Sequence, residues 1–318
     1  MNRNSCSSST FIFLISLALL LLLKQGSEIP EISESNKRLS KDYTCIEARD
    51  ALSHTLERIR NSALKFEPFP HLIVDQIFTD TYYAHILRNI INATESTLFK
   101  KRGPLKPRYS LDLVNAAEQS RQAKQVNLKE KILFWKCHYQ TFGASEFTEH
   151  ITNSFSSVLN KRLGRDYYSK LSRRAPTKKP RFFQRMNLVQ DRDKYFISPH
   201  TDVAEKFITM LFYLAPIKND FRLRDAGTLL LAPSNPRDNS KSNDVCDLVK
   251  FRATCRYVKF QGKYYRFKQC EFEANRLVAF APCHSAWHAV PLQNLDGTPR
   301  DTIQSFVGST SAFPLGKC

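Results

Sequence analysis

The chain has 318 residues, of which 42% are hydrophobic and 12% aromatic. This length and apolar content suffice for the core of one large domain, and they exclude a chain that is disordered throughout. Nine glycines and fifteen prolines without a repeated spacing also exclude a fibrous or solenoid protein. The formal net charge of +18 would usually suggest a nucleic-acid partner, but the N-terminal segment argues against one.

That segment, Phe11–Leu23, is apolar except for Ser16 and follows a short stretch that carries Arg3. This layout is typical of a secretory signal, and the run is shorter than the roughly 20 residues of a membrane-spanning helix. The residues after it, Leu23–Gly26, offer few of the small residues of a cleavage site, so two alternatives stay open. Residues 1–26 are a signal peptide or a retained N-terminal membrane anchor, and residues 27–41 are a linker.

In either case the rest of the chain enters the lumen of the secretory pathway, in the endoplasmic reticulum or the Golgi, with secretion as the alternative. Nucleic acid is therefore not expected as a partner. Asn92-Ala93-Thr94 is a glycosylation acceptor there. Seven cysteines follow the signal segment, and we expect most of them to form disulfides in an oxidising compartment, with one left over.

Residues 161–185 hold ten lysines and arginines against the single acid Asp166. We interpret this stretch as a solvated basic loop. The alternative is a docking site for an acidic protein, a sulfated glycan or an anionic membrane surface.

The N-terminal half reads mainly as helices. Apolar residues at helical spacing predict a helix over 43–66 that stops before Pro68, and a short buried strand over 68–75. A second helix is expected after Thr79 or Asp80, which can cap it, and a third over 147–163. Residues 42–180 are thus predicted to be a helical support region.

From Phe182 onward, short apolar runs alternate with turns, which favours a β-sandwich or barrel. The expected strands are Met186–Val189, Phe207–Leu214, Thr228–Leu231, Val258–Phe260, Arg276–Phe280, Ala286–Val290 and Thr302–Val307. We therefore predict a mainly β fold with N-terminal helices, in which residues 181–318 form a jelly roll.

The metal ligands are suggested by His200-Thr201-Asp202, because side chains two residues apart leave the same face of an extended backbone. Taken alone, this pair also fits an ordinary surface turn. His288, 86 positions after Asp202 at the end of an apolar strand, supplies a third ligand. Two histidines and one carboxylate leave three coordination positions open, as an oxygen-activating Fe(II) centre requires and a closed structural zinc site does not.

Arg300 follows His288 by twelve residues. Its planar guanidinium can bind a carboxylate through two parallel hydrogen bonds, which suits the far end of a metal-bound dicarboxylate. Thr302, two positions on, shares its face and could donate a third bond. For any single arginine in so basic a chain, the alternative is a solvated charge.

Five motifs follow one another in the C-terminal half: His200-x-Asp202, Asp225–Leu229, Asn275–Phe280, Trp287-His288-x-Val290 and Arg300-x-Thr302. In this order they resemble the prolyl 4-hydroxylase-like 2-oxoglutarate/Fe(II) oxygenases. The resemblance covers residues 182–310, and Pro68–Phe78 resembles a strand often found upstream. Residues 100–180 and 235–270 have no counterpart. The family's glycine pair is Ala226-Gly227 here, and Pro291–Pro299 is longer than the matching loop.

The resemblance implies a double-stranded β-helix that holds Fe(II) at His200, Asp202 and His288. It also implies 2-oxoglutarate as co-substrate at Arg300 and Thr302, with Tyr213 as a further contact, although a core aromatic is an equal alternative for Tyr213. The expected activity is hydroxylation of a C–H bond with O2, with ascorbate as the reductant that rescues oxidised iron.

The substrate implied by the resemblance is a protein or peptide, with proline as the usual target. Two alternatives remain, an oxygenase that acts on a small molecule or glycan and a non-catalytic jelly-roll binding protein. The complete ligand set disfavours the second. Cys283 and His284 flank the His288 strand but are expected to be structural, because adjacent residues in a strand point to opposite faces.

Overall fold

The computed structural model describes residues 34–93, 96–101, 107–115, 125–164, 182–216, 221–234, 245–248, 257–292, 295–309 and 315–316, without the side chains of 34–44, 182, 221, 222 and 246. Contacts divide the chain into two compact units, Met1–Lys41 and Asp42–Cys318. Among the described helices, none combines the length and apolar character needed to cross a membrane. The apolar segment 11–23 and most of the basic stretch 161–185 lie outside the described residues.

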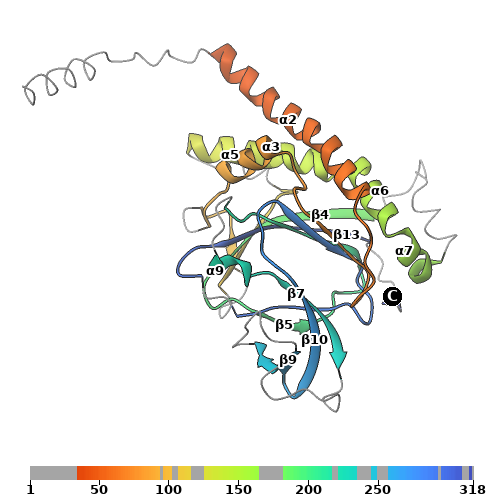
Figure 1. Cartoon of the computed structure of the whole chain (residues 1–318). Helices are drawn as coiled ribbons and strands as arrows, with labels where there is room; N and C mark the ends of the chain where they lie inside the picture. The colour runs from red at the N-terminus through yellow and green to blue at the C-terminus, as the bar shows by residue number, and fades with distance from the viewer. Residues whose placement is uncertain are drawn as a thin grey trace, which may run out of the picture. The chain divides into compact units, whose positions relative to one another are not determined.

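The second unit is built on two sheets (Figure 1). The larger sheet has the strand order β1 (His71–Val74), β11 (Arg276–Phe280), β6 (Lys206–Tyr213), β13 (Arg300–Ser309), β4 (Phe182–Asp191), β3 (Arg108–Asp112) and β2 (Lys100–Lys101). The smaller sheet has the order β5 (Ile197–His200), β12 (Trp287–Val290), β7 (Thr228–Ser234), β10 (Lys263–Cys270), β9 (Tyr257–Phe260) and β8 (Val245–Asp247). Except for the parallel pair β8 and β9, the described pairings are antiparallel. The arrangement is a double-stranded β-helix, as the sequence predicts.

Alternation along the strands separates two cores. In β13, Ile303 and Val307 belong to an apolar cluster shared with the helices. In β6, Leu211 and Tyr213 belong to a second cluster, which also holds Leu230 of β7 and therefore lies between the two sheets. Successive residues of one strand thus serve the helical layer and the space between the sheets.

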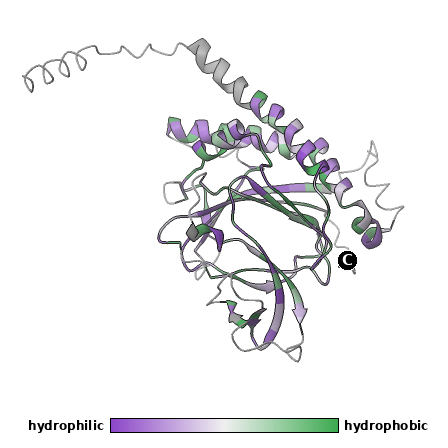
Figure 2. Ribbon diagram, viewed as in Figure 1, coloured by the Kyte–Doolittle hydropathy of each residue, from purple (hydrophilic) through white to green (hydrophobic). Residues whose placement is uncertain are grey.

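The helices are α2 (Glu34–Arg60), α3 (Asp80–Arg88), α5 (Val126–Phe142), α6 (Ser145–Ser154), α7 (Ser156–Leu163) and the short α9 (Phe221–Arg224). In Figure 1, α5, α6 and α7 lie on the side of the larger sheet away from the smaller one. Trp135 and Phe142 of α5 and Phe147 of α6 are fully buried there. In Figure 2 the helices carry both hydrophobic and hydrophilic stretches, as expected when one face packs on a sheet.

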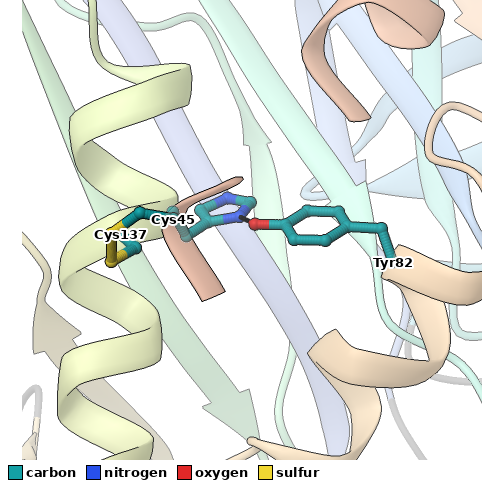
Figure 3. The surroundings of a disulfide bond; sticks show 4 residues. Cys45, Tyr82 and Cys137 are labelled. Atoms are coloured by element: carbon teal, nitrogen blue, oxygen red, sulfur yellow. Dashed lines mark hydrogen bonds between the residues drawn. A yellow bond between two sulfur atoms is a disulfide. The ribbon is translucent and has the colours of Figure 1, made fainter. Parts of the chain in front are cut away.

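A disulfide joins α2 to α5 through Cys45 and Cys137. Figure 3 shows it beside Tyr82, whose hydroxyl lies 2.9 Å from Nδ1 of the buried His138 ring. Burial lowers the pKa of His138 to about 3, so this ring is a neutral core side chain. Cys283 is also disulfide-bonded, whereas Cys270 is a buried free thiol. Among the described cysteine side chains, Cys45, Cys137 and Cys283 are therefore in disulfides, as expected, and Cys270 is not.

The seven expected strands are confirmed within β4, β6, β7, β9, β11, β12 and β13, and the strand over 68–75 is β1. Thr79 caps α3 as predicted, with its hydroxyl accepting a hydrogen bond from the backbone N–H of Tyr82. The helix predicted over 43–66 ends at Arg60, and the one predicted over 147–163 is interrupted at Phe155 into α6 and α7. The predicted domain boundary at 181 falls directly before β4, while β1, β2 and β3 come from the region before it.

Candidate metal centre

His200, Asp202 and His288 come together at one edge of the smaller sheet. His200 ends β5, Asp202 lies in the turn that follows, and His288 in β12 is the direct pairing partner of His200. The potential ligand atoms of the three side chains all lie within 4.8 Å of one another. A single ion could therefore contact all three, as the spacing in the sequence predicts.

The backbone fixes which nitrogen each histidine presents. Nδ1 of His200 lies 2.9 Å from the carbonyl of Ser198, and Nδ1 of His288 lies 3.2 Å from the carbonyl of Ala286. A carbonyl only accepts, so in each neutral ring Nδ1 carries the proton and Nε2 keeps its lone pair. This is the tautomer that a metal ligand requires.

His288 is held neutral. Burial lowers its pKa to about 4, and the neighbouring His200 acts in the same direction. The ring of Phe280 lies 4.7 Å away between centroids and forms part of the apolar surroundings. At neutral pH His288 therefore needs no proton loss before it binds a metal.

Asp202 is held as a carboxylate. Burial alone would raise its pKa, but electrostatic interactions with His288 and Lys206 and hydrogen bonds from Lys206 and Thr209 outweigh burial and lower it. Nζ of Lys206 donates to Oδ1 at 2.6 Å, and the hydroxyl of Thr209 donates to Oδ2 at 2.5 Å. Each carboxylate oxygen has a second lone pair, so these bonds orient Asp202 while it remains able to bind a metal.

The three residues predicted to bind the co-substrate also meet. Arg300 begins β13, Thr302 is the direct partner of Tyr213 at the end of β6, and the Arg300 guanidinium lies 5.6 Å from the centre of the Tyr213 ring. All three are fully buried, and burial raises the pKa of Tyr213 to about 12. The Tyr213 hydroxyl donates to Thr228 Oγ1 at 2.9 Å and accepts from the Thr228 N–H at 3.1 Å.

Arg300 has partners within the protein. Its Nε donates to the carbonyl of Ala226 at 2.6 Å, and its Nη1 donates to Asp191 Oδ2 at 2.7 Å. Asp191 also accepts two bonds from Arg108, at 2.6 and 2.9 Å. One buried carboxylate therefore serves the buried Arg300 and the partly buried Arg108, and this group of three carries a formal net positive charge.

Gly227 allows β7 to begin against the end of β10. A Cβ at this position would lie 1.8 Å from the carbonyl oxygen of Cys270, far inside van der Waals contact. Alanine is tolerated at position 226, where the family has the first glycine of its pair, because it is Gly227 that lies against the carbonyl of Cys270.

Sequence reasoning missed Lys206, Thr209, Asp191 and Arg108. Lys206 and Thr209 carried a usable signal, because Thr209 shares the face of Tyr213 in a period-2 strand and Lys206 lies four residues after Asp202. Arg108 and Asp191 are 83 positions apart, and their pairing depends on the register of β3 on β4.

No protein-family model matches this chain, and no curated protein matches its sequence. Among solved structures, a prolyl hydroxylase from Trichoplax adhaerens, in complex with a peptide fragment of the hypoxia inducible factor oxygen degradation domain, is 10% identical with a TM-score of 0.41, covering 84% of this chain and 93% of that one. A prolyl-4-hydroxylase from Pseudomonas putida is 9% identical with a TM-score of 0.39, covering 81% and 98%. HygX from Streptomyces hygroscopicus, with nickel and 2-oxoglutarate bound, is 8% identical with a TM-score of 0.38, covering 78% and 85%.

At these values of identity and TM-score the similarity is distant, so the chemistry of this chain follows from its own residues. Its topology and its ligand set are both present in the described part of the chain. The chain is a jelly-roll protein in which His200, Asp202 and His288 form a cluster that could hold a metal ion.

Proposed function

We propose that this chain is an Fe(II)- and 2-oxoglutarate-dependent dioxygenase that hydroxylates a C–H bond of its substrate. The observation that carries this proposal is the cluster of His200, Asp202 and His288, in which Nδ1 of each histidine faces a backbone carbonyl and the carboxylate is held ionised. Two nitrogens and one oxygen suit Fe(II), and three ligands leave room for co-substrate and O2. In the overall reaction, substrate, O2 and 2-oxoglutarate give hydroxylated substrate, succinate and CO2.

When bound, the iron supplies the redox chemistry that activates O2. The protein's part is to position and to shield. The carbonyls of Ser198 and Ala286 orient the two histidines, while Lys206 and Thr209 orient Asp202. The apolar side chains between the sheets, such as Phe280, keep water from the His288 side of the site.

Arg300 is proposed to hold the distal carboxylate of 2-oxoglutarate, with Thr302 and Tyr213 beside it. The support is electrostatic, because the one carboxylate of Asp191 faces two guanidinium groups, those of Arg300 and Arg108. A buried charge of this kind is costly until an anion neutralises it. The Arg300 guanidinium also stacks near Phe272, at 5.0 Å from the ring centre, which holds its plane in place.

The substrate class that we favour is a protein or peptide, with a prolyl side chain as the first candidate. Ascorbate is the proposed reductant. The support is the ordered motif set from His200 to Thr302, which resembles that of the prolyl 4-hydroxylase-like oxygenases.

The test is succinate release by the purified lumenal part of the chain, supplied with Fe(II), 2-oxoglutarate, ascorbate and proline-rich peptides. We expect one iron per chain, and loss of both iron and turnover in His200→Ala, Asp202→Ala and His288→Ala. His284→Ala, which removes a neighbouring histidine outside the cluster, is the matched control and should keep both. Full iron content and turnover in His288→Ala would refute the assignment.

We further propose that the protein works in the secretory pathway, in the endoplasmic reticulum or Golgi, as a signal-directed or membrane-anchored protein. The disulfide between Cys45 and Cys137 supports this, because such bonds persist mainly in oxidising compartments. Glycosylation at Asn92 belongs to the same proposal.

A further inference from the structure

A cavity of about 380 Å³ lies against the metal centre on the inner side of the larger sheet. Its walls come from β2, β3, β4, β6 and β13. Lys206 and Thr209 belong to this lining, and both donate hydrogen bonds to Asp202. A molecule in the cavity would therefore lie next to the carboxylate of the proposed iron ligand.

The charged residues of the lining are mostly cations. They are Lys100, Arg108, Arg185 and Lys206, against the single carboxylate of Asp112. Asp112 is already engaged, since it accepts hydrogen bonds from the N–H of Val114 and from the side-chain amide of Asn115. The excess positive charge of the wall is thus not cancelled from within.

Two of these cations, Arg108 and Lys206, are paired with buried carboxylates, but the positive charge of each is only partly neutralised. Arg108 shares Asp191 with Arg300, so one negative charge serves two guanidinium groups. Lys206 is paired with Asp202, whose charge a bound metal ion would claim. If iron binds Asp202, the carboxylate neutralises less of the positive charge of Lys206.

Arg185 differs from both. In the described part of the chain no carboxylate pairs with it, and its guanidinium lies 5.5 Å from the centre of the Phe183 ring. It stands on β4 directly opposite Phe306 of β13, which also lines the cavity. The fork of an arginine without an acidic partner is suited to a bidentate oxyanion.

The remaining lining fits a polar ligand with a short apolar part. Asn187 and Gln304 offer amide groups, whereas Val189 and Leu211 offer aliphatic surface on the side toward Thr302 and Tyr213. Among the described residues of the lining, Asp112 is the one carboxylate that a cationic ligand could meet.

We propose that this cavity holds an anionic group of the substrate, a carboxylate, sulfate or phosphate, beside the C–H bond that is oxidised, and that Arg185 selects it. This deepens the proposed function and rests on it. Acidic residues that flank a target side chain and a small phosphorylated or sulfated molecule are two sources of the same chemistry.

The test is a set of dissociation constants measured with the full chain, Fe(II) and saturating 2-oxoglutarate without oxygen. The probes are proline-containing peptides of equal length flanked by Glu, by Gln or by Lys, together with glucose, glucose 6-phosphate and glucose 6-sulfate. We expect an anionic probe to bind about 10-fold or more tightly than its uncharged analogue. A preference seen only with peptides assigns a protein substrate, and one seen only with the sugars assigns a small molecule.

Variants identify the residue. Arg185→Gln should remove the preference for the anionic probe, and Arg185→Lys should keep part of it. Arg266→Gln is the matched control, because Arg266 is a solvent-exposed arginine like Arg185 but lies on β10 outside the cavity, and it should keep the full preference. The KM for 2-oxoglutarate should be unchanged in Arg185→Gln.

Equal binding of anionic and uncharged probes would overturn the proposal, and so would an unchanged preference in Arg185→Gln. Competition between the anionic probe and 2-oxoglutarate would also overturn it, because the cavity would then be the co-substrate's. Iron content and succinate release in the wild-type chain report separately on the proposed function. If these fail while the anion preference persists, it is the oxygenase assignment that is wrong.

Discussion

Arg300 is fully buried and shares its counter-ion, Asp191, with Arg108. Its Nε and Nη1 are used by Ala226 and Asp191. A dicarboxylate that binds there must be accommodated alongside Asp191 or in its place. The affinity for 2-oxoglutarate is therefore expected to depend on Arg300 far more than on any solvated arginine.

Arg300→Ala should weaken 2-oxoglutarate binding by about 30-fold or more, since loss of one partner of a buried charge pair typically costs about 2–5 kcal/mol. Arg300→Lys should recover only part, because an ammonium lacks the fork. Titration of uncoupled 2-oxoglutarate decarboxylation, with iron content measured in parallel, tests this. Iron should be retained in both variants.

If the midpoint of the 2-oxoglutarate titration is unchanged in Arg300→Ala, another arginine binds the co-substrate. Arg276 is the comparison to make, because it also lies close to Tyr213 but is paired with Asp75 and Glu273. Arg276→Ala should leave the 2-oxoglutarate midpoint unchanged.

Asp301 gives the fold a pH dependence of its own. Burial raises its pKa from 3.8 to about 7, and the charge of Asp191 adds to this, while Gln190 and Arg192 oppose it. Between these two values the folded chain keeps a proton that the unfolded chain has lost. Its contribution to stability therefore falls as the pH rises from about 4 to 7.

Asp301→Asn should remove this dependence. Relative to the wild type, the variant should gain roughly 2–4 kcal/mol in the free energy of unfolding between pH 4 and pH 8. Urea unfolding at several pH values measures the difference, with Asp50→Asn, an exposed acid of α2, as the control. A constant difference across this range would show that Asp301 is ionised in the folded protein.

Among the elements, α2 depends on its covalent link to α5. The disulfide joins cysteines 92 positions apart and so closes a long loop of the unfolded chain. Cys45→Ala and Cys137→Ala should each cost roughly 2–5 kcal/mol. The double variant should lose about as much free energy of unfolding as either single variant, because each substitution removes the same disulfide. Urea unfolding of the three variants tests this, and additive losses would contradict it.

The start of β7 is a second sensitive element. Gly227→Ala places a methyl group against the carbonyl of Cys270, in the backbone of β10, where no side-chain rotation can relieve the clash. We expect a loss of several kcal/mol or failure to fold, on the order of the larger single-residue effects in proteins. Ala226→Gly, at the adjacent position, should cost about 1 kcal/mol or less, and thermal unfolding of the two variants compares them.

Elements whose apolar residues recur at a regular spacing could be predicted from the sequence, and the others could not. Apolar runs of strand length predict β6, β11 and β13, and the N-cap Thr79 and the helical spacing of apolar residues predict α3. The helix α5 was missed because its buried face includes the polar residues His138 and Thr141 beside Phe134 and Trp135, so apolar residues alone do not mark it. The break at Phe155 has no proline or glycine to mark it, and the ends of α6 and α7 are set by packing.

At the scale of the molecule, the fold and the clustering of His200, Asp202 and His288 could be predicted from the order of the motifs, because each motif is local. The surroundings of Arg300 could not. Its direct partner across the sheet is Asp191, 109 positions away, and only the register of β13 on β4 brings them together. The cavity has the same origin, since its lining comes from five strands that are distant in sequence.

The proposed secretory location is tested on the whole chain. Protein isolated in its native state should contain few free thiols among its cysteines, with Cys270 as one of them. Its mass should fall on removal of N-linked glycans, and Asn92→Gln should abolish that change. A count near seven free thiols and no glycan would instead indicate a reducing compartment.

Asp191 finally links two places that would otherwise be independent. Through it, a guanidinium on β3 in the cavity wall and a guanidinium on β13 share one counter-ion. An anion that releases Arg300 from Asp191 leaves that carboxylate wholly to Arg108, and so alters the field that a second anion meets in the cavity. Because such coupling is reciprocal, co-substrate and substrate should change each other's affinity by the same factor, and Asp191 is the residue through which this coupling would act.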